Sequence, residues 1–203
     1  SGTDTAISIP STIRNMPVTA IADKAFYGRK ELTAITIPNT VTTIGNRAFY
    51  QCSGLVRMTL PDSVTKLGSY AFARCTSLNA VTLSENLTAL EDYTFYACFE
   101  LKSLRIPASV TKLGTDLISK YGFTFTFCGD APEFDPEAFL YRHVICNYPA
   151  SNPTWTENVT QDYGGYDVEW NALDVIPPVL TGKGFSLSFE DEILTNLYYT
   201  LSG

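Results

Sequence analysis

The segment TTIGNRAFYQCSGLVRMTLP (residues 42–61) decides the fold, because three other segments of the chain repeat its pattern. They are TAIADKAFYGRKELTAITIP (19–38), TKLGSYAFARCTSLNAVTLS (65–84) and TALEDYTFYACFELKSLRIP (88–107), so that a phenylalanine recurs every 23 residues, at 26, 49, 72 and 95. A fixed period of this length is typical of a solenoid, in which each repeat is one coil that buries its apolar side against its neighbours.

Each repeat contains a short run with the alternation of a β-strand. In the first of them Ile35 and Ile37 are expected to point inward and Thr36 outward. A proline ends the run at 38, 61 and 107, since proline cannot donate to a sheet ladder, and Ser84 takes this place in the remaining repeat. The repeats therefore predict one parallel sheet along one side, with turns or short 3₁₀ segments on the other side.

The rest of each coil supplies a corner and a core. Gly45, Gly68 and Gly114 follow a second apolar pair and are expected to take a positive φ at the corner, where Glu91 is the exception. The Ala-Phe pair then fills the coil, with Thr94 replacing the alanine in one repeat. Three cysteines, at 52, 75 and 98, follow the phenylalanine by three residues. A ladder of inward thiols is favoured, although adjacent coils would also bring these residues within disulfide range.

Composition excludes several classes of function. The chain has 203 residues, 17% charged residues and a formal net charge of −7, with no basic run, which argues against binding to nucleic acid or to an anionic membrane surface. No apolar stretch reaches the roughly 20 residues that span a bilayer, so no membrane insertion is expected. The chain begins Ser-Gly-Thr without an initiator methionine, which is compatible with a processed or recombinant piece of a longer protein.

The repeat resembles a known family. The pattern L-x-x-I-x-I-P-x-x-V-x-x-I-G-x-x-A-F-x-x-C is similar to the leucine-rich repeat of BspA-like bacterial surface proteins. Its slots are filled in order by Leu32, Ile35, Ile37, Pro38, Val41, Ile44, Gly45, Ala48, Phe49 and Cys52. The resemblance implies a right-handed leucine-rich repeat stack, an α/β solenoid dominated by β structure. It also implies an extracellular or bacterial cell-surface protein that acts by binding and has no catalytic residues.

The regular pattern is expected to cover residues 1–115, with a long and atypical first repeat. Residues 116–172 are interpreted as degenerate closing repeats, with Phe125 and Phe127 in one strand and Val144 to Tyr148 in the next, followed by an aromatic cap. The cap holds Trp155, Tyr163, Tyr166 and Trp170. A linker over 173–184 is expected to precede a C-terminal β extension, over 185–203, that is either a hairpin or the start of a second domain.

Little in the sequence favours chemistry. His143 is the one histidine, no Cys-x-x-Cys or His-x-x-x-His pair occurs, and a catalytic triad would depend on this residue alone. The acidic clusters Glu133-x-Asp135-x-Glu137 and Glu190-Asp191-Glu192 lack the spacing of a calcium loop. We therefore expect no enzyme, no catalytic residue, no metal and no cofactor. A pair between Cys128 and Cys146 stays an alternative to free thiols.

The outward face of the sheet is the candidate binding surface. Its candidate ligand-binding residues are Thr36, Arg57, Thr59, Thr82, Ser103 and Arg105. We expect a monomer that contacts a protein partner there, with a host extracellular or cell-surface protein as one candidate. A hydrated threonine ladder without a ligand is the alternative reading of this face. Two other functions remain open, a carbohydrate-binding module that uses Trp155, Tyr163 and Trp170, and a structural spacer for a missing C-terminal domain.

Overall fold

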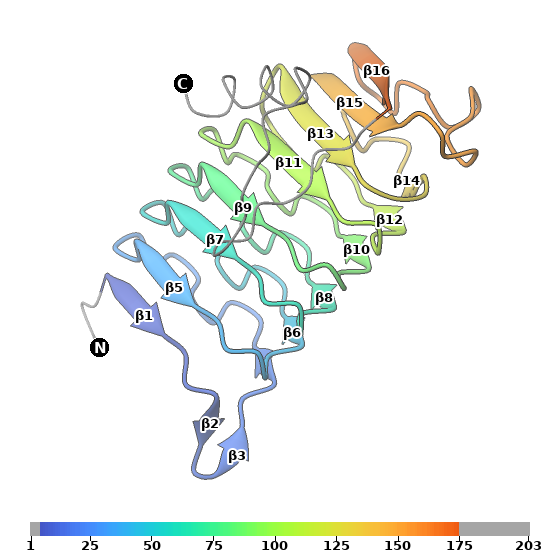
Figure 1. The fold of residues 1–203 in the computed structure, drawn as a ribbon. Helices are drawn as coiled ribbons and strands as arrows, with labels where there is room; N and C mark the ends of the chain where they lie inside the picture. The colour runs from blue at the N-terminus through green and yellow to red at the C-terminus, as the bar shows by residue number, and fades with distance from the viewer. Residues whose placement is uncertain (1–4, 175–203) are drawn as a thin grey trace, which may run out of the picture.

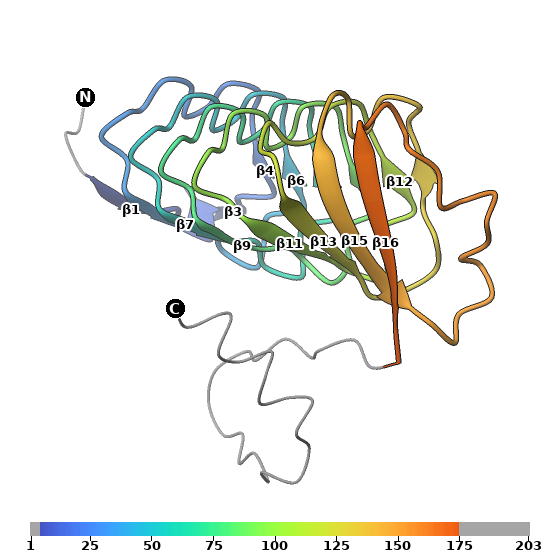
Figure 2. The same cartoon turned by 90° about the horizontal axis from the view of Figure 1, so that it is seen from above.

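The computed structural model describes residues 5–174, which form a solenoid of parallel strands (Figure 1). Longer strands make one side, which we call the long-strand face. They are β1 (Ala6–Ser8), β5 (Ala34–Thr36), β7 (Arg57–Thr59), β9 (Ala80–Thr82), β11 (Ser103–Ile106), β13 (Phe123–Phe127), β15 (His143–Pro149) and β16 (Asp167–Leu173). Figure 2 shows from above how successive coils follow one another along this face.

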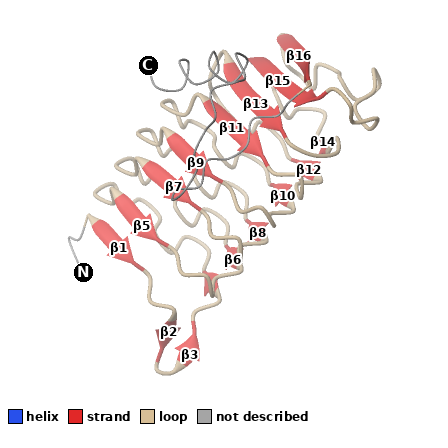
Figure 3. Ribbon diagram, in the orientation of Figure 1, coloured by secondary structure: helices blue, strands red, loops and turns tan. Residues whose placement is uncertain are grey.

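A second column of parallel strands, each only two residues long, lines the next side of the coils. Its members are β4 (Ala20–Ile21), β6 (Thr43–Ile44), β8 (Lys66–Leu67), β10 (Ala89–Leu90), β12 (Lys112–Leu113) and β14 (Glu133–Phe134). The sequence predicted one sheet, so this column is an addition. The remaining side consists of turns, as predicted, and no helix occurs within residues 5–174 (Figure 3). The described chain therefore contains no helix that could cross a membrane.

The phenylalanines of the repeat stack in one column through the regular coils. Phe49, Phe72 and Phe95 are almost completely buried, and Phe26 at the end of the column is partly buried. Successive ring centroids lie 5.1, 5.2 and 5.7 Å apart, and the ring planes differ by 5° or less. A coil cannot bury its own phenylalanine on both sides, so the neighbouring coils supply that burial.

The predicted alternation and the predicted thiol ladder are both confirmed. Ile35 and Ile37 are buried and Thr36 is exposed. The thiols of Cys52, Cys75 and Cys98 are buried, and each donates to the carbonyl of the phenylalanine one coil earlier at 3.1 Å. All five cysteines are free, so the alternative of disulfides, including a Cys128–Cys146 pair, is wrong.

The prediction of a positive φ for the corner glycines is wrong. The glycines with positive φ are Gly28, Gly122 and Gly164, and the corner glycines are needed instead because the coils approach closely there. A Cβ on Gly68 would lie 2.6 Å from the backbone nitrogen of Asn46. The space left by the missing side chain holds the Asp or Asn of the preceding coil.

That Asp or Asn accepts a hydrogen bond from the backbone of the next coil. Asp23 Oδ1 accepts from Asn46 N at 2.7 Å, Asn46 Oδ1 from Ser69 N at 2.9 Å, and Asp92 Oδ1 from Thr115 N at 3.0 Å. The corner with Glu91 in place of glycine has Ser69 below it, where the other corners have Asp or Asn. A corner glycine therefore occurs together with an Asp or Asn in the preceding coil, because that side chain fits only where the glycine leaves space.

The other two departures from the repeat are also accommodated. Ser84, which replaces the strand-ending proline, is fully buried, and its hydroxyl accepts from Asn86 N at 3.2 Å. Thr94, which replaces the repeat alanine, is fully buried and donates its hydroxyl to the carbonyl of Glu91. Each buried hydroxyl thus has a local partner, which removes most of the cost of its burial.

The first repeat is long because it carries a hairpin. The antiparallel strands β2 (Thr12–Ile13) and β3 (Met16–Pro17) are joined by Arg14 and Asn15, both of which have positive φ. Positive φ at two successive residues is the geometry of a type I′ turn. The sequence predicted an atypical first repeat and missed the hairpin, since two-residue strands leave no measurable periodicity.

The closing coils, residues 116–174, contain the predicted strands and one that was missed. Phe123, Phe125 and Phe127 are buried in β13, and Val144 and Cys146 are buried in β15. The final strand β16 pairs with β15 along its whole length and was not predicted. Leu173, the first residue of the predicted linker, ends this strand. The rest of the linker from residue 175 and the predicted extension over 185–203 lie outside the described residues.

Candidate functional site

The residues predicted to bind a ligand lie together on the long-strand face. Thr36, Arg57, Thr59, Thr82 and Ser103 are exposed, and Arg105 is half-buried. The strand register places Thr59 beside Thr82 and Arg57 beside Ala80. The hydroxyls of the three threonines have no hydrogen-bond partner within residues 5–174, so they are available to water or to a ligand.

The two arginines of this face differ in their surroundings. Arg105 donates to Glu85 Oε1 at 2.6 Å, and its Nε is buried without a partner. Arg57 is exposed and has no ion pair to a described residue. An exposed ion pair contributes at most about 1 kcal/mol, so Arg105 can exchange Glu85 for an acidic group of a ligand.

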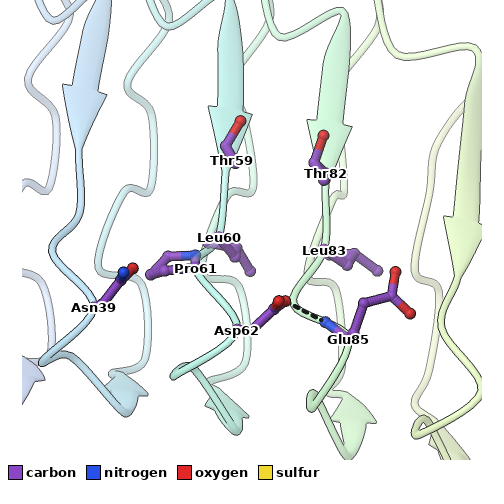
Figure 4. Close-up of a pocket in the computed structure, with 8 residues that line it drawn as sticks. All are labelled: Asn39, Thr59, Leu60, Pro61, Asp62, Thr82, Leu83 and Glu85. Carbon is purple, nitrogen blue, oxygen red and sulfur yellow. Dashed lines mark hydrogen bonds between the residues drawn. The ribbon is translucent and has the colours of Figure 1, made fainter. Parts of the chain in front are cut away.

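An open depression of about 470 Å³ lies at the carboxyl end of β7 and β9. Figure 4 shows Thr59 and Thr82 side by side at its upper rim, with Asn39, Asp62 and Glu85 along the next turn of each coil. Glu85 N donates to Asp62 Oδ1 at 2.9 Å, which fixes the position of that carboxylate. The depression therefore presents hydroxyls on one side and carboxylates on the other.

A second exposed surface was missed by the sequence analysis. It lies beside the buried phenylalanine column and consists of tyrosines and arginines at three other positions of the repeat, two residues before the phenylalanine and one and two residues after it. The rings of Tyr27 and Tyr50 are stacked at 4.9 Å, and the guanidinium of Arg47 lies 4.9 Å from the ring centroid of Tyr70. Tyr93 takes the position of Arg47 and Tyr70 in a later coil, and Arg74, at a third position, lies 6.0 Å from the ring centroid of Tyr50. The signal was an aromatic residue after the repeat phenylalanine, which the sequence analysis passed over.

The aromatic residues of the closing coils pack against one another. Trp155 is 8% exposed, and its indole nitrogen donates to the carbonyl of Gly129 at 3.0 Å. Its ring lies 4.9 Å from that of Phe127 and 5.1 Å from that of Tyr148. Trp170 packs on Phe134 at 5.7 Å. These faces are occupied by the core of the last coils, as expected for a cap.

Burial makes the thiols of the ladder poor nucleophiles. Burial raises the pKa of Cys52 to about 11 and that of Cys98 to about 12. The pKa of Cys75 is raised well above its ordinary value, first by burial and then by its neighbours Cys98 and Cys52. A thiol must ionise to react, so these residues serve packing and hydrogen bonding.

The structure brings His143 close to two carboxylates. His143 is the first residue of β15, and its Nδ1 lies 3.0 Å from the carbonyl oxygen of Asp167 and 3.3 Å from Oδ2 of the same residue. Its Nε2 lies 3.7 Å from Glu169 Oε1. Their separation along the chain hides this proximity, because the pairing of β15 with β16 was not predicted. The acidic cluster at 190–192 lies outside the described residues.

A carboxylate and an arginine form a partly isolated pair in the same part of the molecule. Asp116 is 7% exposed, and its Oδ1 lies 3.9 Å from Arg142 Nη2. Burial raises the pKa of Asp116, Arg142 opposes this shift, and Glu137 adds to it. Neither Asp116 Oδ1 nor Arg142 Nε has a hydrogen-bond partner. This pair does not lie with the candidate ligand-binding residues.

One solved structure shows the same fold, and others are less similar. A leucine-rich repeat protein of T. pallidum (TpLRR) has a TM-score of 0.59 and 24% identity, over 85% of this chain and 88% of that chain. A leucine-rich repeat protein from Bacteroides capillosus is 33% identical over 58% of this chain and 67% of that one, with a TM-score of 0.32. A leucine rich cell surface protein from Faecalibacterium prausnitzii has 17% identity and a TM-score of 0.29, over 83% and 60% of the two chains. None of the curated proteins matches the chain.

The family model for the BspA type leucine rich repeat region matches residues 5–142 in six copies. This range covers more than half of the chain and includes the first closing coils. The apolar positions of the repeat within this range are buried at equivalent places in successive coils. The chain therefore belongs to the BspA-type leucine-rich repeat family.

Proposed function

We propose that the chain is a non-enzymatic binding module of a bacterial cell-surface or secreted protein, and that it contacts a protein partner through the long-strand face. The observation that carries the proposal is the row formed by Thr36, Thr59 and Thr82. Their hydroxyls are exposed, evenly spaced by the coils and unbonded within the described chain. Such a rigid polar row can donate and accept hydrogen bonds without first losing internal ones.

Charge at the edge of this row would orient a partner. Arg57 lies on β7, two residues before Thr59 and on the same outward side, and Arg105 lies two strands further along, on β11. Below them the depression carries Asp62 and Glu85. A partner with an acidic group facing the arginines and a donor facing the carboxylates fits this arrangement, and such rim charges affect the rate of association most.

The proposal is tested with an array of secreted and cell-surface proteins probed with the labelled chain. The double variant Arg57→Ala/Arg105→Ala should weaken each true hit at least about tenfold, because a charged hydrogen bond contributes 1.5–3 kcal/mol. Its melting temperature should stay close to that of the wild type, since Arg57 is exposed and the ion pair of the half-buried Arg105 contributes at most about 1 kcal/mol. A matched control is Arg47→Ala/Arg74→Ala on the tyrosine–arginine surface. Hits that respond only to the control variant would place binding on that surface and reject the long-strand face.

The two alternatives have their own readouts. Sugar-specific hits on a glycan array that disappear in Tyr163→Ala would support a carbohydrate-binding module, although the packing of Trp155 in the core does not favour it. A structural spacer would keep its activity when the repeats are replaced by unrelated coils. The location at the cell surface is part of the proposal and is supported by membership of the family.

A further inference from the structure

The last two strands of the long-strand face place one imidazole and two carboxylates within reach of a single ion. His143 and Asp167 are direct partners in the pairing of β15 with β16, and Glu169 follows on the same side of β16. One donor atom from each residue lies within 4.8 Å of the other two. The parallel ladder fixes the three backbones, so the cluster does not depend on a loop.

The hydrogen bond of the imidazole through Nδ1 leaves Nε2 free to bind a metal ion. When Nδ1 donates to the carbonyl of Asp167, at 3.0 Å, the neutral ring carries its lone pair on Nε2. A backbone carbonyl in this role is common for histidines that bind a metal. Nε2 lies 3.7 Å from Glu169 Oε1. The Asp167 carboxylate lies on the Nδ1 side of the ring, 3.3 Å from that nitrogen, so its side chain must rotate to share an ion with Nε2 and Glu169. Donors that share one Zn²⁺ lie roughly 3–4 Å apart, given bonds of about 2.1 Å, and the three donors here lie within 4.8 Å of one another.

Within the described chain the two carboxylates of the cluster have His143 as their partner, and it pairs with them as an ion only when its ring is protonated. Neither Asp167 nor Glu169 has a lysine or arginine within ion-pair distance among residues 5–174. The basic residue next in sequence, Arg142, turns instead toward Asp116 and the carbonyl of Tyr141. Two carboxylates this close repel each other, and a cation between them would remove that repulsion.

We propose that His143, Asp167 and Glu169 bind a divalent transition-metal ion of the Zn²⁺ class on the long-strand face. One nitrogen and two oxygen donors suit Zn²⁺ better than Ca²⁺ or Mg²⁺, which prefer all-oxygen sites. Three protein donors leave at least one position open, to be filled by water or by a side chain of a bound protein. The site stands on its own geometry and does not require the proposed partner.

The decisive measurement uses the single histidine of the chain. Zn²⁺ is titrated into the tag-free 203-residue protein while the imidazole signals are followed by NMR, and calorimetry gives the stoichiometry. We expect one ion per chain and a shift of the His143 signals that saturates at that ratio. Unshifted imidazole signals at one equivalent overturn the proposal, and this measurement needs no variant.

Variants separate this site from other carboxylates and thiols. His143→Ala and Glu169→Gln should each lower the Zn²⁺ affinity at least about tenfold, since even an outer-shell partner contributes that much. Two matched controls should leave the affinity unchanged, namely Glu133→Gln in another acidic cluster and Cys128→Ser at the half-buried thiol. Ca²⁺ that binds as tightly as Zn²⁺, with His143→Ala unaffected, would show diffuse binding to carboxylates and reject the site.

Discussion

The regular coils and the closing coils use the same residue type in opposite ways. In the regular coils (residues 19–115) phenylalanine rings lie parallel, with planes that differ by 5° or less, because each coil repeats the one before. In the closing coils Phe134 meets Phe139 at 67° and Trp170 at 85°. Parallel stacking buries a ring only where a further coil covers it. The final coil has no such neighbour, so rings packed at steep angles cover its open side instead.

The change of packing accompanies a change of period. From β7 to β11 the coils keep the 23-residue register, whereas Ser103 pairs with Thr124, Thr124 with Ile145, and Ile145 with Glu169. The first two of these coils are therefore each two residues shorter than the regular ones, and the last is one residue longer. Coils of unequal length cannot superimpose all their side chains, which is why large aromatic residues of several kinds occupy this part of the core.

The largest expected effect comes from the middle of the phenylalanine column. Phe72→Ala should lower the free energy of unfolding by about 3–5 kcal/mol, because the ring is fully buried between two others and the coils cannot collapse into the space. Urea unfolding measures this. Phe99→Ala, at a side chain that is 54% exposed, is the control and should stay within about 0.5 kcal/mol of the wild type. Equal losses would mean that the column does not carry the fold.

The closing coils offer the matching test. Trp155→Ala should cost about 3 kcal/mol, at the low end of the range for buried aromatics, since one side of the ring borders the surface. Hydrogen exchange should accelerate first in β15 and β16, because these strands lie in the coils that Trp155 covers. Tyr166→Ala, at a residue 69% exposed, should change neither quantity. Uniform acceleration along all coils would show that the two regions unfold as one unit.

Alkaline pH should act on the thiol ladder of the regular coils. The folded pKa values of Cys52 and Cys98 lie above the ordinary value of 9.0, so above about pH 9 the unfolded chain releases protons that the folded chain keeps. Stability therefore falls as the pH rises, by about 1.4 kcal/mol per pH unit for each such thiol. Urea unfolding between about pH 8.5 and about pH 10 measures the slope.

A variant assigns that slope to the ladder. Cys75→Ala removes one buried thiol whose pKa is strongly raised, and it should flatten the alkaline slope whatever it does to stability at neutral pH. The half-buried Cys128 has a smaller rise in pKa, so Cys128→Ala should change the slope least. A slope that is the same in all three proteins would contradict the role of buried thiols.

The smallest effect concerns the one corner that lacks a glycine. In the double variant Ser69→Asn/Glu91→Gly, the new amide oxygen would accept from the next coil as Asn46 does from Ser69. The coupling energy from a double-mutant cycle should be favourable by about 0.5–1.5 kcal/mol, the net value of one hydrogen bond. Ser69→Asn alone should destabilise, because the Cβ of Glu91 occupies the required space. Additive effects would reject the pairing of glycine with the residue below it.

The sequence by itself determined the features that repeat. The 23-residue spacing of phenylalanine predicted the stack, and the alternation around Thr36 predicted the strands, because repetition along a chain forces repetition in space. The thiol ladder and the degenerate closing strand at Phe125 and Phe127 followed from the same argument. The candidate ligand-binding residues were found as a face because residues at one repeat position line up.

Only the tertiary structure decided what depends on contact between coils. The corner glycines are required because an added Cβ would come within 2.6 or 2.7 Å of a backbone nitrogen in the preceding coil, which no local conformational preference reveals. The approach of His143 to Asp167 and Glu169 depends on a strand pairing that crosses an irregular loop. The burial of Trp155 also depends on the tertiary structure, because the rings that surround it come from other parts of the chain. A sequence specifies its own periodicity, whereas close contacts between coils depend on registers that the chain sets only when it is folded.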